Sequence, residues 1–357
     1  MLIISKKELF WSGFLVSILW FWWIGYSFIY YEIEYLIPFI VIAIGIIYGF
    51  LFYLAGVIEN IYARAVYFFL FTFIYPFGFN WLQLELPFIN SLLGTSKLDF
   101  VLILFSIVLI IKLKTYKKYL AVIPLLFALN VQVPNIEQPT LKIFMANINI
   151  LQKNKWDQRY LKDIIDINFK AIDTAIYNNN DLVVLPESTF PLVLNNHKDL
   201  ISRLQQKSKY ISIVLGSLYK KNDSYHNSTY FFQNGQMHIA HKVVLIPFGE
   251  AVPLPEKLRN FVNNTFYKGA SDYVRAKYPT DFIIKGIKFR SAICYEATTD
   301  DIFDNMEGRY MISISNNGWF FKSIQPVLQA LLLKYYAIKY NVKIFNIANM
   351  SANTIIN

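Results

Sequence analysis

The chain has 357 residues, of which 55% are hydrophobic and only 16% are charged. Soluble globular proteins carry roughly 25% charged residues, so this composition argues against a disordered chain, an ordinary cytosolic enzyme and a nucleic-acid-binding arm. Residues 1–135 carry 8 Lys and Arg against 6 Asp and Glu, whereas residues 136–357 carry 26 against 18. The sequence therefore predicts a membrane domain over 1–136 and a basic folded domain over 137–357.

Long uncharged segments mark the expected membrane crossings. No Asp, Glu, Lys or Arg occurs in 9–31, 35–58, 65–84, 100–111 or 119–136. A helix needs about 20 apolar residues to cross a bilayer. The first three segments meet this length easily, the fifth meets it with little to spare, and the fourth needs its flanking residues as well. We therefore expect about five transmembrane helices.

The basic residues between these segments predict the orientation. Short cytoplasmic loops of membrane proteins are enriched in Lys and Arg. With the N-terminus in the cytoplasm, Lys97 is the one basic residue on the opposite side. Seven basic residues are then cytoplasmic, namely Lys6, Lys7, Arg64, Lys112, Lys114, Lys117 and Lys118. Because five is an odd number of crossings, the second domain is expected outside the cytoplasm.

The second domain alternates short apolar runs with polar helical stretches, a pattern typical of layered α/β or α+β folds. Strands are expected at 141–150, 182–185, 211–218, 229–233, 238–245, 282–284, 288–294 and 310–314. Helices are expected at 156–177 and 327–340, followed by a strand-like run over 342–356. The single cysteine, Cys294, excludes an internal disulfide and a multi-cysteine metal site.

Polar side chains stand at the ends of three apolar strands. Glu187 follows VVLP, Lys242 lies in HIAHKVVLIPFGE, and Cys294 ends FRSAIC. A thiol attacks as its thiolate and needs a proton acceptor, which a buried glutamate provides, and a fixed ammonium can stabilise an oxyanion. The residues alone leave the structural alternative open: a packed thiol, which is the commoner role of a lone buried cysteine, a turn glutamate and a strand-edge lysine.

In this order, the segments VVLPESTFP, HKVVLIPFGEAVP and ICYE resemble the Glu-Lys-Cys signature of the nitrilase (carbon–nitrogen hydrolase) superfamily. Within it, the chain is similar to the membrane branch, the apolipoprotein N-acyltransferase family. That family's opening pattern G-N-I-x-Q-x-x-K-W is matched by residues 148–156, with Ile148 in place of glycine. Its V-P-F-G-E-x-V-P block is matched by 246–253, and its S-N-D-x-W-F block by 315–320, with Asn317 in place of aspartate.

The resemblance implies a multi-span α-helical membrane domain joined to an α/β domain that is a four-layer αββα sandwich. It implies that Cys294 attacks the sn-1 ester of a phospholipid, with Glu187 as the base. Lys242 and the backbone N–H of Tyr295 are expected to hold the oxyanion. The α-amino group of diacylglyceryl-cysteine in an apolipoprotein then takes the acyl chain from the thioester. No cofactor, metal or nucleic acid is implied.

The resemblance also implies supporting residues and a location. Glu250 is expected to pair with Lys242 or Glu187, and Glu296 to support the site. Three residues are expected to contact substrate: Trp156, Asn316 and Trp319. The segment 250–270 is expected to line the lipid entrance. The implied location is the bacterial inner membrane, with the catalytic domain on its periplasmic side.

The chain departs from the family pattern at both ends. It has fewer expected spans than is usual, and it stops at Asn357, where the family continues with further strands and a final membrane helix. We therefore expect a C-terminally incomplete catalytic domain with an unpaired sheet edge. Two alternatives stay open. One is a membrane-tethered amidase or nitrilase-type hydrolase that uses water as second nucleophile, and the other is a catalytically inactive envelope homologue.

Overall fold

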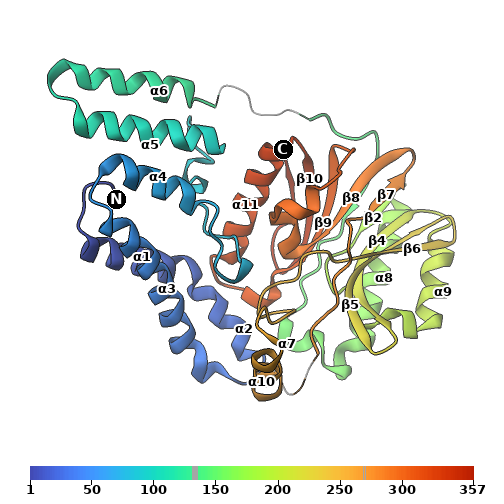
Figure 1. Cartoon of the computed structure of the whole chain (residues 1–357). Coiled ribbons are helices and arrows are strands. Elements are labelled where there is room, and N and C mark those ends of the chain that lie inside the picture. Colours follow the sequence, from blue (N-terminus) through green and yellow to red (C-terminus); the bar gives the residue numbers. More distant parts are fainter. Residues whose placement is uncertain (131–135, 268, 270) are drawn as a thin grey trace. The chain divides into compact units, whose positions relative to one another are not determined.

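The chain consists of two compact units, residues 1–133 and 134–357, in the computed structural model. The structure describes residues 1–130, 136–267, 269 and 271–357 (Figure 1). The division lies close to the change in charge density that the sequence shows near residue 136.

The first unit is helical. Its α-helices are α1 (Lys6–Phe21), α2 (Tyr26–Ile29), α3 (Ile37–Val57), α4 (Ile61–Phe71), α5 (Lys97–Lys112) and α6 (Val122–Phe127). Short 3₁₀ turns occur at Trp22–Gly25, Glu34–Leu36, Pro76–Gly78, Leu86–Phe88 and Thr115–Ala121. Among the described residues, three segments are long and apolar enough to cross a membrane: Lys6–Ile29, Glu34–Val57 and Ile61–Gly78.

The fourth and fifth expected spans form shorter helices. α5 has 16 residues, and at 1.5 Å per residue it extends about 24 Å, less than the ~30 Å hydrocarbon core of a bilayer. α6 has 6 residues and continues a 3₁₀ turn of 7 residues, while residues 131–135 of the expected fifth span lie outside the described part of the chain. The expected total of five crossings therefore stays a prediction for these two segments.

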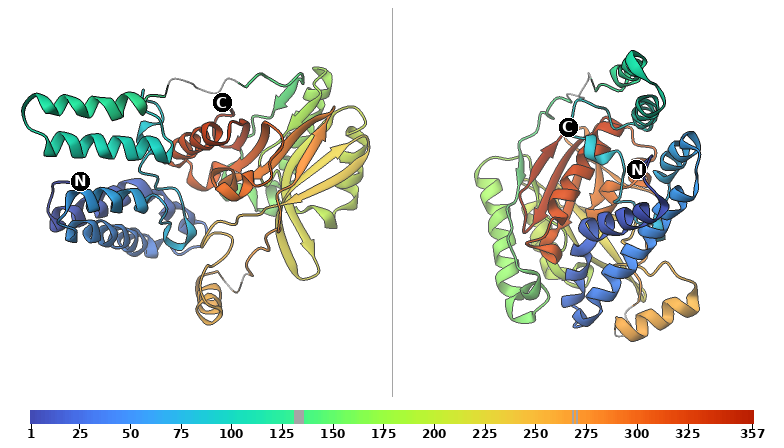
Figure 2. Two further views of the ribbon diagram at one scale, coloured as in Figure 1. Left: turned by 45° about the horizontal axis from the view of Figure 1, so that its top comes forward. Right: turned by 90° about the vertical axis from the view of Figure 1, so that its left-hand side faces the viewer.

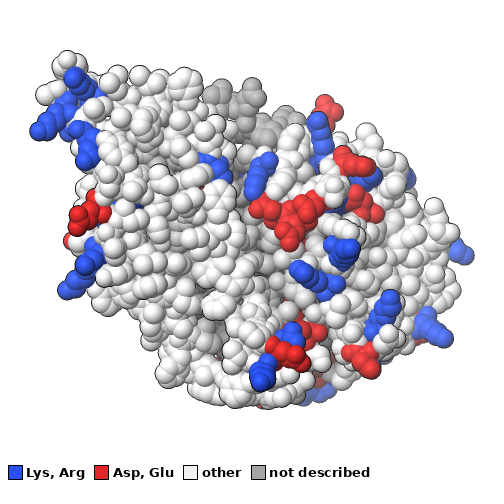
Figure 3. All heavy atoms as spheres, viewed as in Figure 1, with Lys and Arg blue, Asp and Glu red and all other residues white. Residues whose placement is uncertain are grey.

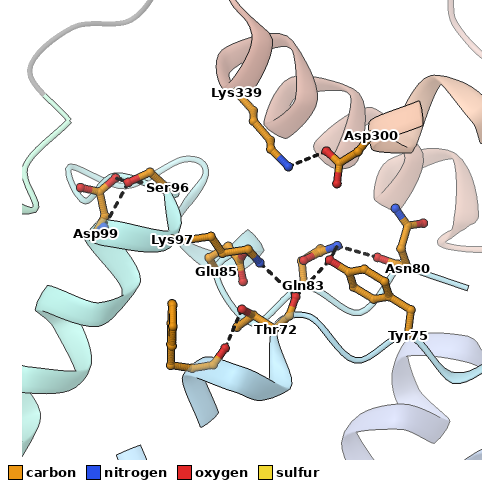
Figure 4. Close-up of polar contacts among 11 residues, drawn as sticks. Thr72, Tyr75, Asn80, Gln83, Glu85, Ser96, Lys97, Asp99, Asp300 and Lys339 are labelled. Carbon is orange, nitrogen blue, oxygen red and sulfur yellow. Dashed lines mark hydrogen bonds and ion pairs between the residues drawn. The ribbon is translucent and has the colours of Figure 1, made fainter. Parts of the chain in front are cut away.

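Local sequence sets where α1 and α5 begin. At α1, the Glu8 N–H donates to Ser5 Oγ at 3.3 Å, and the Ser5 N–H donates to Glu8 Oε2 at 2.7 Å. Ser96 and Asp99 form the same reciprocal pair at the start of α5 (Figure 4). Such capping boxes satisfy N–H groups that have no partner in the first helical turn.

Glycines let α1 and α3 approach closely. A Cβ atom on Gly13 of α1 would lie 2.6 Å from the carbonyl oxygen of Tyr48 on α3. A Cβ atom on Gly45 of α3 would lie 2.7 Å from the ring of Phe14 on α1. Small residues at such crossings allow the van der Waals contact that holds membrane helices together.

The second unit is built on two sheets. The first contains β1 (Ile143–Met145), β2 (Leu182–Val184), β4 (Ser212–Lys221), β5 (Ser224–Gln233) and β6 (Gln236–His241) in this order, and β3 (Phe190–Val193) pairs with β4. The second contains β11 (Thr354–Ile356), β10 (Lys343–Asn349), β9 (Tyr310–Asn316), β8 (Ile287–Ile293) and β7 (Asp281–Ile284) in this order. The helices are α7 (Gln152–Lys155), α8 (Leu161–Tyr177), α9 (Lys198–Lys207), α10 (Glu256–Phe266) and α11 (Gln325–Tyr340).

The two sheets face each other, and helices cover their outer sides (Figure 2). Between the sheets, Val184 and Val214 belong to the same buried cluster as Ile293 and Ile312. A second cluster joins the outer side of the first sheet to α8 and α9, and α11 covers the second sheet. Apolar side chains on both faces of each sheet are thereby removed from water. The expected four-layer αββα sandwich is confirmed.

Two elements differ from the sequence expectation. The helix expected over 156–177 begins at Leu161, because the Asp157 side chain accepts the Arg159 N–H at 3.0 Å and starts a separate 3₁₀ turn. The run over 342–356 is not one strand but the antiparallel pair β10 and β11, with β11 at the end of the second sheet.

Candidate active site

The three polar residues that the sequence singled out all follow strands of the second unit. Glu187 lies in the turn after β2, Lys242 directly follows β6, and Cys294 directly follows β8. All three are buried, with 8%, 0% and 9% of their surface exposed. Electrostatic interactions among them contribute to the pKa of each. Both sheets thus supply groups to one buried cluster.

A chain of hydrogen bonds connects Lys242 to Glu187. Lys242 Nζ lies 2.8 Å from Glu250 Oε2 and 3.0 Å from Glu250 Oε1. Asn227 on β5 donates through Nδ2 to both Glu250 Oε1 and Glu187 Oε1, at 2.8 Å each. Of the two partners expected for Glu250, Lys242 is the ion-pair partner, and Asn227 links the pair to Glu187. The arrangement holds an ammonium and two carboxylates in fixed positions.

The turn that carries Glu187 packs tightly against β4. Ser188 has a left-handed φ of 50°, and the Thr189 N–H donates to the Gly216 carbonyl at 2.8 Å. A Cβ atom on Gly216 would lie 2.7 Å from the Cα of Glu187. Only glycine permits this approach, because backbone atoms cannot give way as a flexible side chain can. Gly216 therefore sets how closely Glu187 sits to the sheet.

Glu296 joins the Lys242 segment to the cysteine strand. Its Oε2 accepts the N–H groups of Val243 and Val244 at 2.7 and 3.2 Å, and its Oε1 accepts the Ile293 N–H at 2.7 Å. These bonds end β6 at His241, although the apolar sequence predicted a strand over 238–245. Burial raises the pKa of Glu296 to about 7, against the opposing effect of Lys242 and the three N–H donors.

The cysteine is a neutral thiol at rest. Burial and the negative charge of Glu187 raise the pKa of Cys294 to about 12, although Lys242 acts in the opposite direction. Cys294 has a left-handed φ of 54°, and Gln329 Nε2 on α11 lies 3.8 Å from its Sγ. A thiol of this kind reacts only when a neighbouring base removes its proton.

The neighbouring carboxylate and ammonium have complementary properties. Burial raises the pKa of Glu187, with Lys242 opposing the shift, so this carboxylate can accept a proton and later release it near neutral pH. Burial lowers the pKa of Lys242, but Glu250 and Glu187 raise it by more, so the net pKa lies above its ordinary value. Lys242 is therefore a permanent cation. A base, a cation and a thiol are the components of nucleophilic acyl transfer.

The three residues expected to contact substrate have different surroundings. Asn316 is buried, its Nδ2 donates to Gln152 Oε1 at 2.9 Å, and its Oδ1 accepts from Asn349 Nδ2 at 2.8 Å. This side chain joins β9 to α7 and β10. Trp156, at the end of α7, is 42% exposed, and Trp319 is partly buried in a 3₁₀ turn. A contact of any of the three with substrate stays a prediction.

The expected entrance segment contains a helix. α10 has no buried residue, and it exposes Leu258 and Phe261 by 54% and 61%. Lys268 and Ala270 of this segment lie outside the described residues. The spacing of the two apolar side chains, three residues apart, places them on one face of α10.

Sequence reasoning missed Asn227, Gly216 and Gln329. Each looks ordinary in the sequence, because Asn227 and Gly216 lie within strands and Gln329 lies within a helix. The one local signal is polarity: Asn227 and Gln329 are polar residues that are 5% and 1% exposed, and buried polar groups normally have a partner. Among the described residues, no group of three His, Cys, Asp or Glu could hold a metal ion.

Comparison with known proteins identifies the family. Residues 1–131 match the family described as "Apolipoprotein N-acyltransferase integral membrane domain". Proteins named apolipoprotein N-acyltransferase from Wolinella succinogenes, Helicobacter hepaticus and Helicobacter pylori are 41%, 36% and 36% identical to this chain. The alignments cover 96%, 99% and 98% of this chain and 83%, 90% and 83% of those proteins.

Solved structures with similar folds are more distant. The crystal structure of a CN-hydrolase superfamily protein from Xanthomonas campestris, with an arsenic adduct in its active site, covers 62% of this chain and 83% of that one. It has a TM-score of 0.45 and 14% sequence identity. The resemblance read from the sequence motifs is confirmed by the curated relatives, whose alignments extend over nearly the whole chain. This chain therefore belongs to the apolipoprotein N-acyltransferase family.

Proposed function

We propose that this protein transfers an acyl chain from the sn-1 position of a phospholipid to the α-amino group of diacylglyceryl-cysteine at the N-terminus of an apolipoprotein. One observation carries the proposal: a buried thiol, base and cation lie together in a chain that aligns with apolipoprotein N-acyltransferases over 96% of its length. The partners are the phospholipid donor, the diacylated apolipoprotein and the membrane itself.

The first half-reaction loads the enzyme. Glu187 takes the thiol proton of Cys294, and the thiolate attacks the ester carbonyl of the phospholipid. Lys242, held by Glu250 at 2.8 Å, faces the negative charge that develops on the carbonyl oxygen, together with the backbone N–H of Tyr295. The ester C–O bond breaks, and Glu187 returns its proton to the departing lysophospholipid. The acyl chain is then bound to Cys294 as a thioester.

The second half-reaction unloads the acyl chain. The α-amino group of the lipidated cysteine attacks the thioester, its proton passes to Glu187, and the same oxyanion contacts apply. The C–S bond breaks, an amide C–N bond forms, and the thiol of Cys294 is restored by the proton that Glu187 holds. One carboxylate thus serves both steps, which agrees with a pKa raised by burial toward neutrality.

Apolar surface supports a lipid entrance over the segment 250–270. Leu258 and Phe261 expose a large part of their side chains on α10, and Trp156 exposes 42% of its surface on α7. Exposed apolar groups of this kind mark sites that contact lipids or other proteins. We assign Trp156 and Trp319 to the approach of the acyl donor and the lipoprotein, and Asn316 to the framework that holds the approach in shape.

Charges within the first unit support its orientation. Arg64 Nη1 donates to the carbonyl groups of Leu2 and Ile4, and Lys112 Nζ lies 5.8 Å from the ring centre of Tyr62. Basic residues at the starts of α1 and α4 and at the end of α5 therefore gather at one end of this unit, which Figure 3 shows as blue side chains at the left.

The remaining basic residue lies at the other end of α5. Lys97 Nζ donates to the Thr72 carbonyl at 3.0 Å and pairs with the buried Glu85 (Figure 4). α5 therefore runs alongside α4 in the opposite direction. Either three or five crossings place the second unit on the side opposite the N-terminus. We infer a multi-pass protein of the bacterial inner membrane with its catalytic domain in the periplasm.

Lysine labelling tests this topology. In intact spheroplasts, a membrane-impermeant amine reagent should modify the exposed Lys153 and Lys198, whereas the exposed Lys117 should be modified only after the membrane is permeabilised. Labelling is read by peptide mass spectrometry, and permeabilised spheroplasts are the control for chemical reactivity. Modification of Lys117 in intact spheroplasts, with protection of Lys153, would contradict the orientation.

Intact mass tests the reaction itself. After incubation of the purified protein with a phospholipid of defined acyl chains, its mass should rise by one acyl group, and a diacylated lipopeptide should remove that group. The lipopeptide should gain the same mass. Release of free fatty acid without any gain on the peptide would identify a hydrolase instead, and the absence of acyl loading would overturn the proposal.

A further inference from the structure

Lys155 is a buried lysine beside the proposed base, and the two half-reactions above make no use of it. Its side chain is 1% exposed, and its Nζ donates to the main-chain carbonyl oxygen of Glu187 at 3.0 Å. Within the described part of the chain, Lys155 forms no ion pair, whereas Lys242 is paired with Glu250. A buried ammonium without an adjacent carboxylate is costly, so its position needs a reason.

The neighbouring charges indicate what Lys155 does. Four groups face Glu187: the ammonium groups of Lys242 and Lys155, the carboxylate of Glu250 and the amide of Asn227. Glu250 largely offsets Lys242, because the two form a direct ion pair at 2.8 Å, and the amide is neutral. Lys155 is therefore the cation that remains to balance the negative charge of Glu187.

The titration of the pair agrees with this balance. Burial lowers the pKa of Lys155 to about 7, while the charge of Glu187 acts in the opposite direction. In return, the charge of Lys155 is one of the effects that oppose the burial-induced rise in the pKa of Glu187. Each group thus favours the charged form of the other.

The short helix that carries Lys155 is itself held in place. Gln152 and Lys155 both lie on α7 and are both buried. Gln152 Oε1 accepts from Asn316 Nδ2 at 2.9 Å, and Asn316 ends β9. The position of the Lys155 ammonium is therefore fixed to the framework of the second sheet, while its hydrogen bond reaches the turn that carries Glu187.

We propose that Lys155 is a positioning residue that acts through Glu187. Its ammonium holds the main-chain carbonyl of the Glu187 turn and supplies the positive charge that favours the ionised carboxylate. When the thiol proton moves to Glu187, the negative charge moves to Cys294, and the total charge of the cluster is unchanged. This inference rests on the role of Glu187 as base in the proposed function.

Alkylation of the single cysteine tests the inference without any lipid substrate. The rate at which iodoacetamide modifies Cys294 is measured from pH 5 to 10 in the full-length protein, by intact mass. Lys155→Met should move the acid limb of this profile upward by about one pH unit, because the pKa of Glu187 rises when the cation is lost. At pH 7 this corresponds to about tenfold slower alkylation.

Three further variants separate charge from packing. Lys155→Gln keeps a hydrogen-bond donor without the charge and should move the limb as Lys155→Met does. Lys155→Arg keeps the charge and should leave the limb in place even where the maximal rate falls. Lys153→Met, an exposed lysine on the same helix, is the matched control and should not change the profile. Thermal unfolding shows which variants are folded.

The result that would overturn the inference is equal slowing by Lys155→Gln and Lys155→Arg with the acid limb unmoved, since a purely structural role predicts this. If Lys155→Met does not fold, the comparison of Lys155→Gln with Lys155→Arg decides. Failure of the proposed function has a different signature. The wild-type protein would then show the alkylation profile and its dependence on Lys155 but would not gain an acyl group from phospholipid.

Discussion

Cys294→Ala is expected to abolish acyl loading while the fold is retained. The thiol is the only cysteine in the chain, so no other residue can carry a thioester. The residue is small and buried, and its loss removes one weak contact, with Gln329 Nε2 at 3.8 Å. Intact mass after incubation with phospholipid should show no added acyl group, against a complete shift for the wild type.

Cys294→Ser is the companion variant for this test. It keeps an atom that can accept from Gln329, but a hydroxyl is much harder to ionise than a thiol, so loading should be barely detectable. Thermal unfolding of both variants should match that of the wild type within a few degrees. Acyl loading of Cys294→Ala at the wild-type rate would refute the assignment of the nucleophile and, with it, the proposed thioester.

Glu187→Gln is expected to block both half-reactions by about 10²–10⁴-fold, the usual effect of losing a general base. Glutamine has the same shape, and its amide oxygen can still accept from Asn227 Nδ2, which lies 2.8 Å from Glu187 Oε1. Lys155 bonds to the main-chain carbonyl of residue 187, and that bond survives the substitution. The variant therefore removes proton transfer and leaves the geometry intact.

The two half-reactions are measured separately for this variant. Loading is followed by intact mass with phospholipid alone, and unloading by adding a diacylated lipopeptide to whatever thioester has formed over long incubation. Glu307→Gln, which changes an exposed glutamate that pairs with Lys288 at the surface, is the matched control and should behave as the wild type. Normal unloading in Glu187→Gln would show that another group deprotonates the incoming amine.

The membrane segments and the sandwich were largely readable from local patterns. Uncharged runs report membrane burial residue by residue, and alternating apolar strands report burial between layers, because both follow from the solvation of each side chain. The turn at Asn234–Gly235, where both residues have positive φ, was also predicted correctly, since few residues tolerate that conformation. Element ends were less predictable: β6 stops at His241 because a carboxylate 53 residues away, on Glu296, takes the next N–H.

The sequence by itself determined which residues carry chemistry. Glu187, Lys242 and Cys294 lie at strand ends in a recognisable order, and the side-chain types limit what each can do. Only the tertiary structure decided how they are connected. Asn227 links Glu187 to Glu250 across 40 residues of chain, and Lys155 reaches the same turn across 32. Such contacts depend on how two sheets and their helices close on each other, and periodicity along the chain contains no information about distance between elements.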